Sequence, residues 1–176
     1  MKILVTYFSR TGYTRRVAER LAKDLDATIC PIEESGSRLG FLGYSRCLLE
    51  ASFDIDPRIK PITHDPAQFD LVMIGTPIWG WRVASPPRAF ARIHGKQIKR
   101  AAFFCTMGGS GAETAFAQLR QAVGSEPVAT LALTDREIDA NSIAPKLKAF
   151  EDALRDARRA KVGSRAATTQ RPHAQT

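Results

Sequence analysis

The sequence predicts an α/β fold, a single domain built on a doubly wound parallel sheet with helices on both faces. Nearly continuous apolar runs are spread along the 176 residues, and segments with a helical spacing of apolar residues lie between them. Continuous apolar runs, as opposed to alternating ones, are typical of parallel strands that are covered on both faces. Strict alternation of strand and helix predicts right-handed crossovers within one sheet. The length suits one domain.

The apolar runs define five expected strands. "ATICPIE" is the weakest candidate, because Pro31 is awkward in a central strand but tolerated at an edge. The stronger runs are "KILVTYF" (2–8), "FDLVMIGT" (69–76), "RAAFFCT" (100–106) and "PVATLAL" (127–133). The sequence therefore predicts a five-stranded sheet.

Helices are expected between the strands. In residues 14–26, Val17, Leu21 and Leu25 recur every fourth residue and charged residues fill the other face. Prolines suited to a first turn open 85–95, and Gly95 ends it. Further helices are expected over 111–124, 141–160 and the second half of 36–53, with a Pro-rich loop over 54–68.

Composition places the chain among ordinary globular proteins, with 44% hydrophobic and 25% charged residues. No apolar stretch reaches the roughly 18 residues that span a bilayer, and the N-terminus lacks a signal-peptide pattern. We therefore expect no integral membrane segment and a cytoplasmic location. Cys30, Cys47 and Cys105 show no CxxC spacing and are expected to be small buried hydrophobes. The histidines are scattered, so no metal site is expected.

The formal net charge is +8. Part of it lies in residues 161–176, which carry three basic residues, no acid and few large apolar side chains. We expect this basic tail to be disordered and the folded domain to span 1–160. A basic chain suggests nucleic-acid binding, but no aromatic-interleaved basic stripe or recognition motif is present. A solvated basic surface is the favoured interpretation, with no nucleic-acid partner.

Ligands bind such sheets beyond the carboxyl ends of the strands, at the topological switch point. The first strand is followed there by "SRTGYT", residues 9–14, in which hydroxyl side chains and Gly12 precede a helix. Hydroxyls and exposed backbone N–H groups at a helix start favour an anion. The segment is neither a Walker loop nor a GxGxxG fingerprint. A hydroxyl-rich loop without lysine suits one terminal phosphate, because many neutral donors share its charge. The alternative is a simple capped helix.

The next two strand exits are suited to a flat ring. "TPIWGW", residues 76–81, places two tryptophans around Gly80, where a planar ligand could stack and the backbone could adopt a positive φ. The alternative is that these aromatics pack on the neighbouring helix. "TMGGSGAET", residues 106–114, is glycine-rich and would let a ring approach the backbone, although it is a weak nucleotide fingerprint.

Taken together, these segments resemble the flavodoxin-like FMN-binding proteins over about residues 1–155. "SRTGYT" matches their S/T-x-T-G-x-T phosphate loop, and "FDLVMIGTPIWGWRVASPP" is similar to their second flavin loop. The resemblance implies a short-chain member with strand order 2-1-3-4-5 and FMN at the switch point. It assigns the phosphate to Ser9, Arg10, Thr11, Gly12, Tyr13 and Thr14. It assigns the isoalloxazine ring to Pro77, Ile78, Trp79, Gly80, Trp81, Thr106, Met107, Gly108, Gly109 and Gly111.

Two departures from the carrier pattern favour an FMN-dependent oxidoreductase. The resemblance implies that carriers are acidic and stack a tyrosine from the third loop on the flavin, whereas this chain is basic and offers Met107. The expected function is electron transfer from NAD(P)H or a reductase to a quinone-like or other small acceptor. The alternatives are a one-electron carrier between protein partners and a flavin-free interaction module. No catalytic residue is identified. Tyr13, Arg82 and His94 are candidates, and Arg82 is expected either to stabilise anionic reduced flavin or to point to solvent.

Overall fold

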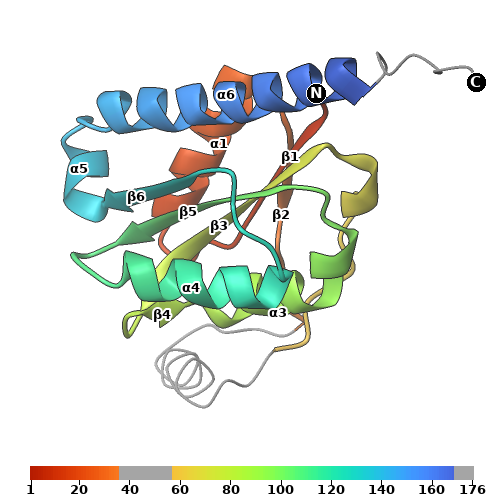
Figure 1. Ribbon diagram of the computed structural model, residues 1–176. Helices are drawn as coiled ribbons and strands as arrows, with labels where there is room; N and C mark the ends of the chain where they lie inside the picture. Colours follow the sequence, from red (N-terminus) through yellow and green to blue (C-terminus); the bar gives the residue numbers. More distant parts are fainter. Residues whose placement is uncertain (36–56, 169–176) are drawn as a thin grey trace, which may run out of the picture.

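The computed structural model describes residues 1–35 and 57–168. Its parallel strands follow the order β2-β1-β3-β5-β6 (Figure 1). This is the predicted order, because β5 and β6 are the fourth and fifth of the expected strands, and the weak candidate is the edge strand. The strands are β1 (Ile3–Tyr7), β2 (Thr28–Pro31), β3 (Leu71–Trp79), β5 (Ala101–Met107) and β6 (Thr130–Thr134).

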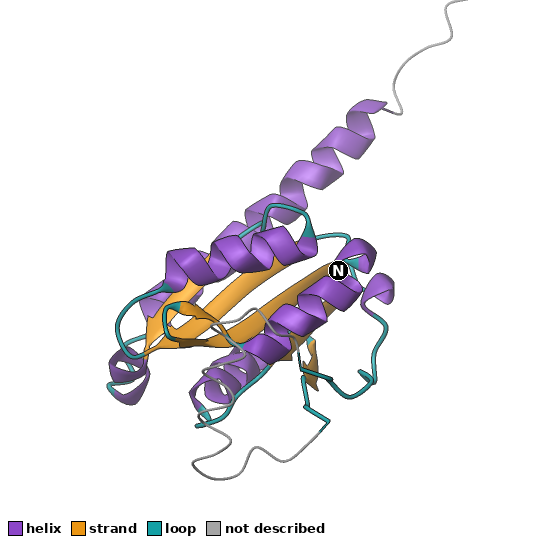
Figure 2. Cartoon of the chain, turned by 90° about the horizontal axis from the view of Figure 1, so that it is seen from below, coloured by secondary structure: helices purple, strands orange, loops and turns teal. Residues whose placement is uncertain are grey.

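Helices cover both faces of the sheet. On one face lie α1 (Tyr13–Leu25) and α6 (Ala144–Thr168), and on the other lie α3 (Ser85–His94) and α4 (Ala112–Val123) (Figures 1 and 2). Each layer buries its own apolar cluster against the sheet. The sheet is therefore a central layer with a core on each side, as the continuous apolar strands predict.

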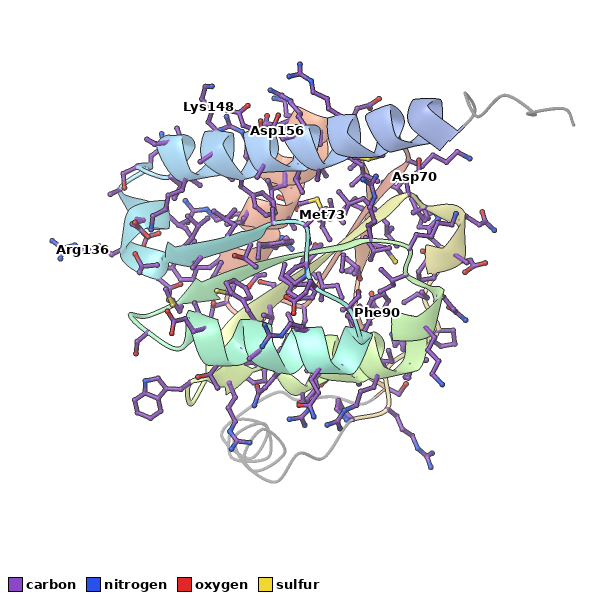
Figure 3. The ribbon with its side chains drawn as sticks, in the orientation of Figure 1. Asp70, Met73, Phe90, Arg136, Lys148 and Asp156 are labelled. Carbon is purple, nitrogen blue, oxygen red and sulfur yellow. The ribbon has the colours of Figure 1, made fainter. Side chains whose placement is uncertain are left out.

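Side chains of the central strands supply both cores. Met73 of β3 lies toward α1 and α6, whereas Phe90 of α3 lies on the other side of the sheet (Figure 3). Gly75 is needed within β3, because a Cβ there would lie 2.1 Å from Cζ of Phe104 on the adjacent strand. Without a side chain at this position, the Phe104 ring packs directly on the backbone of β3.

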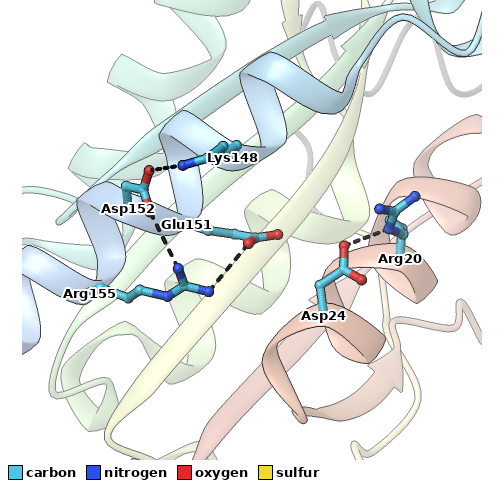
Figure 4. Close-up of polar contacts among 6 residues, drawn as sticks. All are labelled: Arg20, Asp24, Lys148, Glu151, Asp152 and Arg155. Atoms are coloured by element: carbon cyan, nitrogen blue, oxygen red, sulfur yellow. Dashed lines mark hydrogen bonds and ion pairs between the residues drawn. The ribbon is translucent and has the colours of Figure 1, made fainter.

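Ion pairs lie on the surfaces of α1 and α6. Figure 4 shows Arg20 paired with Asp24 on α1, and Arg155 paired with Glu151 on α6. Burial, followed by the negative charge of Asp24, raises the pKa of Glu151. The two arginine side chains are more than half exposed, so each pair is expected to add less than about 1 kcal/mol to stability.

The structure adds elements that the sequence did not predict. The expected third strand ended at Thr76, whereas β3 runs to Trp79 and turns back into β4 (Arg82–Val83) as an antiparallel hairpin. Gly80 and Trp81 form the turn with φ of 54° and 62°, a two-residue turn that matches strand twist. A short helix, α5 (Asp135–Asp139), follows β6, and the 3-10 turns η1 (Pro66–Gln68) and η2 (Gly95–Gln97) flank other elements.

The C-terminal helix is longer than expected. It runs to Thr168, so residues 161–168 of the predicted disordered tail are helical in the structure. Extending a helix from turns that are already packed costs little, and the alanine, lysine and arginine of this segment favour helix. Residues 169–176, Cys47 and the helix predicted in the second half of 36–53 lie outside the described residues. None of the helices in the described part is long and apolar enough to cross a membrane.

Candidate functional site

The three predicted loops follow three neighbouring strands. They leave β1, β3 and β5, which lie side by side in the sheet. Parallel strands end at a common edge, so residues 8–14, the 79–82 hairpin and residues 107–111 meet at the carboxyl edge. The chain goes outward from β1 to β2 and then back across to β3, which makes this edge the topological switch point.

The first loop leaves the start of α1 without a side-chain cap. The Oγ of Ser9 accepts a hydrogen bond from the Gly12 backbone N at 3.2 Å, which closes the loop on itself. Gly12 is the N-cap residue of α1 and has φ 96°. No side chain at this position accepts a hydrogen bond from the first-turn N–H groups. By contrast, Thr134 and Glu137 form a complete capping box at α5. The first-turn N–H groups of α1 therefore remain for an anion, which the helix dipole also favours.

Thr14 and Thr106 link the first loop to the third. Their hydroxyl oxygens lie 2.8 Å apart, and the two residues are 1% and 3% exposed. The sequence placed both residues in the flavin site. In the structure their hydroxyl groups bond to each other beneath the surface, whereas Thr11 is exposed on the loop.

Tyr13 is turned toward α5. Its hydroxyl donates to Asp139 Oδ2 at 2.7 Å, and Arg16 pairs with the same carboxylate at 3.1 Å. The hydrogen bond to Asp139 raises the pKa of Tyr13, and the bonds from Tyr13 and Arg16 lower the pKa of Asp139. These contacts hold the first turn of α1 against α5. Sequence reasoning missed Asp139, since 126 residues separate it from Tyr13 and no spacing signals the pair.

The two tryptophans occupy different environments. Trp79 packs edge to face on Phe8, with ring centroids 5.6 Å apart and planes at 90°. Trp81 is 67% exposed, and its Nε1 donates to Ser110 Oγ at 2.9 Å. Trp79 therefore contacts the first loop, and Trp81 is hydrogen-bonded to the third loop. Sequence reasoning omitted Phe8 and Ser110, although both lie within or beside the quoted loops.

The third loop is partly fixed and partly open. A Cβ on Gly111, which has φ 105°, would lie 2.7 Å from the Trp81 Cα, so only glycine allows this contact with the hairpin. A Cβ on Gly108 or Gly109 would meet nothing within 4 Å. These two glycines therefore border open space at the carboxyl edge, as the ring-binding interpretation requires.

The remaining catalytic candidates are His94 and Arg82. His94 is at the end of α3, where its Nδ1 lies 3.1 Å from Gln97 Oε1, and α3 begins at the site edge and runs away from it. Arg82 lines a cavity with residues of α3 and α4.

Cys30 and Cys105 are buried free thiols, as expected, and burial raises the pKa of Cys105 to about 12. The described residues contain no group of three His, Cys, Asp or Glu side chains that could hold a metal ion.

With this geometry established, comparison with known proteins is informative. The profile of the flavodoxin family matches residues 2–145, a span that includes all three loops and ends inside α6. The chain belongs to the flavodoxin family. No curated protein sequence matches this flavodoxin-family chain.

Solved structures resemble this flavodoxin-family protein over most of its length. A putative flavoprotein from Bacteroides eggerthii DSM 20697 is 27% identical, covers 85% of this chain and 98% of its own, and has a TM-score of 0.67. A putative flavoprotein from Bacteroides uniformis ATCC 8492 is 25% identical, with coverages of 76% and 88% and a TM-score of 0.60. A flavoprotein in complex with FMN from Lactobacillus acidophilus NCFM shares the fold at 22% identity, 79% and 97% coverage and a TM-score of 0.65.

Proposed function

We propose that this flavodoxin-family protein binds FMN at the carboxyl edge and acts as an FMN-dependent oxidoreductase. In this proposal it moves electrons from NAD(P)H or a reductase to a quinone-like or other small acceptor. FMN supplies the electron chemistry when bound, and the chain binds, orients and shields it.

The residues of the first loop fit a singly phosphorylated cofactor. The uncapped start of α1 offers backbone N–H groups, including that of Thr14, whose hydroxyl is buried against Thr106, and Ser9 and Thr11 add hydroxyls near Gly12. Arg10 is exposed beside them and adds positive charge. Neutral donors with one cation suit a single phosphate. We propose that residues 9–14 hold this group, with Tyr13 contributing its backbone N–H because its hydroxyl bonds to Asp139.

The other two loops fit a flat ring. The backbones of Trp81 and Gly111 lie in close contact. This contact fixes the second loop, residues 77–81, relative to the third loop, residues 106–111. Gly108 and Gly109 carry no side chain that would fill the space beside the third loop. Trp79 offers an aromatic surface that Phe8 holds edge to face.

The open third loop is the observation that carries the enzyme proposal. A side chain stacked on the outer face of a flavin would suit a carrier, whereas Gly108 and Gly109 carry no side chain that could cover a bound ring, so a substrate could approach it. The net charge of +8 points the same way, since it favours small anionic reactants over basic protein partners. The fold alone does not decide between the two. NADH:FMN oxidoreductase (EMOB) and Megasphaera elsdenii flavodoxin share it at TM-scores of 0.56 and 0.55, with 14% and 18% identity.

The test begins with the cofactor. Protein saturated with FMN and freed of excess should retain it, and mass spectrometry of the released compound should give FMN. NADH and NADPH oxidation with quinones as acceptors then tests the reaction. If the protein oxidises neither NADH nor NADPH but is rapidly reduced by a reductase, the one-electron carrier is favoured. Colourless protein that takes up no FMN would leave the flavin-free interaction module.

Thr11 gives the sharpest single-residue test of the phosphate site. Its hydroxyl should donate one hydrogen bond to a charged acceptor, worth about 1.5–3 kcal/mol, so Thr11→Val should weaken FMN binding by about one to two powers of ten. Thr130→Val is the matched control, because Thr130 is exposed at the start of β6, at the opposite edge of the sheet. An unchanged dissociation constant for Thr11→Val would remove Thr11 from the site.

A further inference from the structure

The short helix α5 lies beside the start of α1, although most of the chain separates the two in sequence. It follows β6 and ends at Asp139. The Oδ2 atom of Asp139 accepts from the Tyr13 hydroxyl at 2.7 Å, and its Oδ1 atom pairs with Nη1 of Arg16 at 3.1 Å. Nη2 of Arg16 also donates to the Ile138 carbonyl at 3.4 Å. The last two residues of α5 therefore contact the first turn of α1, to which we assign the phosphate.

The position of α5 is itself fixed by three kinds of contact. In its capping box, Thr134 Oγ1 accepts from the Glu137 backbone N at 3.2 Å, and the Glu137 carboxylate accepts from the Thr134 backbone N at 2.8 Å. Lys146 of α6 pairs with Glu137 at 2.7 Å. Ile138 is 3% exposed and belongs to the apolar core that α1 and α6 cover. Asp139 is thus presented to α1 by an anchored element.

The first turn of α1 is held from two sides. On one side, both carboxylate oxygens of Asp139 are bonded, and the Arg16 guanidinium carbon lies 5.9 Å from the centre of the Tyr13 ring. The bonds from Tyr13 and Arg16 lower the pKa of Asp139, so its carboxylate is charged at neutral pH. On the other side, the Thr14 hydroxyl bonds to that of Thr106 on β5. The orientation of this turn therefore depends on α5 and β5 as well as on the loop before it.

We propose that Asp139 is a positioning residue for the phosphate of FMN, an inference that rests on the proposed function of residues 9–14. Asp139 holds Tyr13, so that the N–H groups of the first turn are oriented before the anion arrives. Groups that are already ordered lose less conformational entropy on binding. The negative charge of Asp139 by itself opposes an anion, and Arg16 offsets it. The benefit of Asp139 therefore comes from its hydrogen bond, which separates this proposal from a charge effect.

Titrations of the flavin-free full chain with FMN and with riboflavin, which lacks the phosphate, test the proposal. Asp139→Ala should weaken FMN binding about three- to tenfold and change riboflavin binding less than about twofold. Asp139→Asn keeps an oxygen that can accept from Tyr13, so it should retain most of the FMN affinity. Tyr13→Phe should match Asp139→Ala, and the double variant should lose no more than either single variant. Glu19→Ala removes the same charge from an exposed ion pair on α1 and is the control.

A further readout needs no flavin. The Arg16 backbone N bonds to the Gly12 carbonyl at 2.9 Å, and this amide should exchange faster with solvent in Asp139→Ala than in the parent. Equal weakening of FMN and riboflavin would overturn the proposal, because it would mark a general loss of structure. Tighter FMN binding in both Asp139→Ala and Asp139→Asn would overturn it too, since Asp139 would then only repel the phosphate. Unchanged FMN affinity in Asp139→Ala rejects this inference alone, whereas a parent protein that binds no FMN rejects the proposed function with it.

Discussion

The hydroxyl groups of Thr14 and Thr106 lie 2.8 Å apart in the core although 92 residues separate them in the chain. This contact joins the start of α1 to the end of β5 under the proposed flavin site. Replacing either residue by valine leaves the other buried hydroxyl without this partner, at a cost of about 1–2 kcal/mol in the free energy of unfolding.

A double-mutant cycle checks this relationship. Thr14→Val with Thr106→Val should cost less than the sum of the single variants, with a coupling of about 1 kcal/mol in urea unfolding. Thr130→Val, at an exposed position, should change stability by less than about 0.5 kcal/mol. Strictly additive single variants would mean that the two hydroxyls do not support each other.

Gly111→Ala should damage the site through the backbone. Its Cβ would lie 2.7 Å from the Trp81 Cα, and φ 105° is unfavourable for alanine. We expect about 1–3 kcal/mol lower stability and weaker FMN binding, because the hairpin must move away from the third loop. Gly109→Ala is the control, since its Cβ would meet nothing within 4 Å. Thermal melts compare the stability of the two variants, and equal melting temperatures would contradict the steric argument.

Trp81 occupies a conformation that costs energy. It is a bulky residue at φ 62° and is 67% exposed, so packing does not explain its presence. Trp81→Asn should raise stability by roughly 0.5–1 kcal/mol, because asparagine tolerates this region, while flavin binding or turnover falls. Trp81→Phe keeps both the ring and the strain, and it should retain most of the activity. A stabilised Trp81→Asn protein with full activity would show that the indole has no role in the site.

The capping box of α5 should make stability depend on pH in the acid range. Hydrogen bonds from Lys146 and Thr134 lower the pKa of Glu137 from its usual 4.5 to about 2. Since the folded pKa is depressed, this contribution is complete above the unfolded pKa and disappears as the pH falls toward 2.

Glu137→Gln tests that dependence. It should lower stability by about 1 kcal/mol at pH 7, and the difference from the parent should shrink between about pH 5 and pH 2. Thermal melts at pH 7, 4 and 2.5 measure it. Glu126→Gln, in an exposed ion pair, is the matched control and should show little difference at any pH. A constant difference across this range would exclude Glu137 as the titrating group.

Deleting residues 161–176 should leave flavin content and melting temperature nearly unchanged. The anchors of α6, Leu147, Phe150 and Leu154, all lie before the cut. The deleted segment is expected to contribute little packing, because its residues include Val162 as the only large apolar side chain. Comparison of the full and shortened chains by calorimetry checks this, and a large loss of melting temperature would show that the segment packs on the domain.

Sequence patterns predicted the sheet because continuous apolar runs and helical spacing are local signals. They also located the three loops, since each loop directly follows a strand. They did not predict that β3 would continue past Thr76 into a hairpin, because the Gly80-Trp81 turn requires a positive φ at a tryptophan, which residue preferences disfavour.

Contacts between distant segments were beyond the sequence as well. The pairing of Tyr13 with Asp139 and of Trp81 with Ser110 depends on how α5 and the third loop lie against their neighbours. The gathering of Arg82, Arg88 and Arg92 around one cavity likewise follows from the packing of α3, α4 and the hairpin. Charge content alone suggested only a basic surface.

The direction of α6 has a practical consequence for attaching the protein to a surface. Helices of such a domain run opposite to the strands, so α6 begins beside the loop edge and its far end extends from the opposite side of the body (Figure 2). A tether joined beyond this helix would hold the molecule with its loops facing outward. An electrode coated in this way would present the loop edge to dissolved reactants, and the helix would act as a spacer between the metal and the domain.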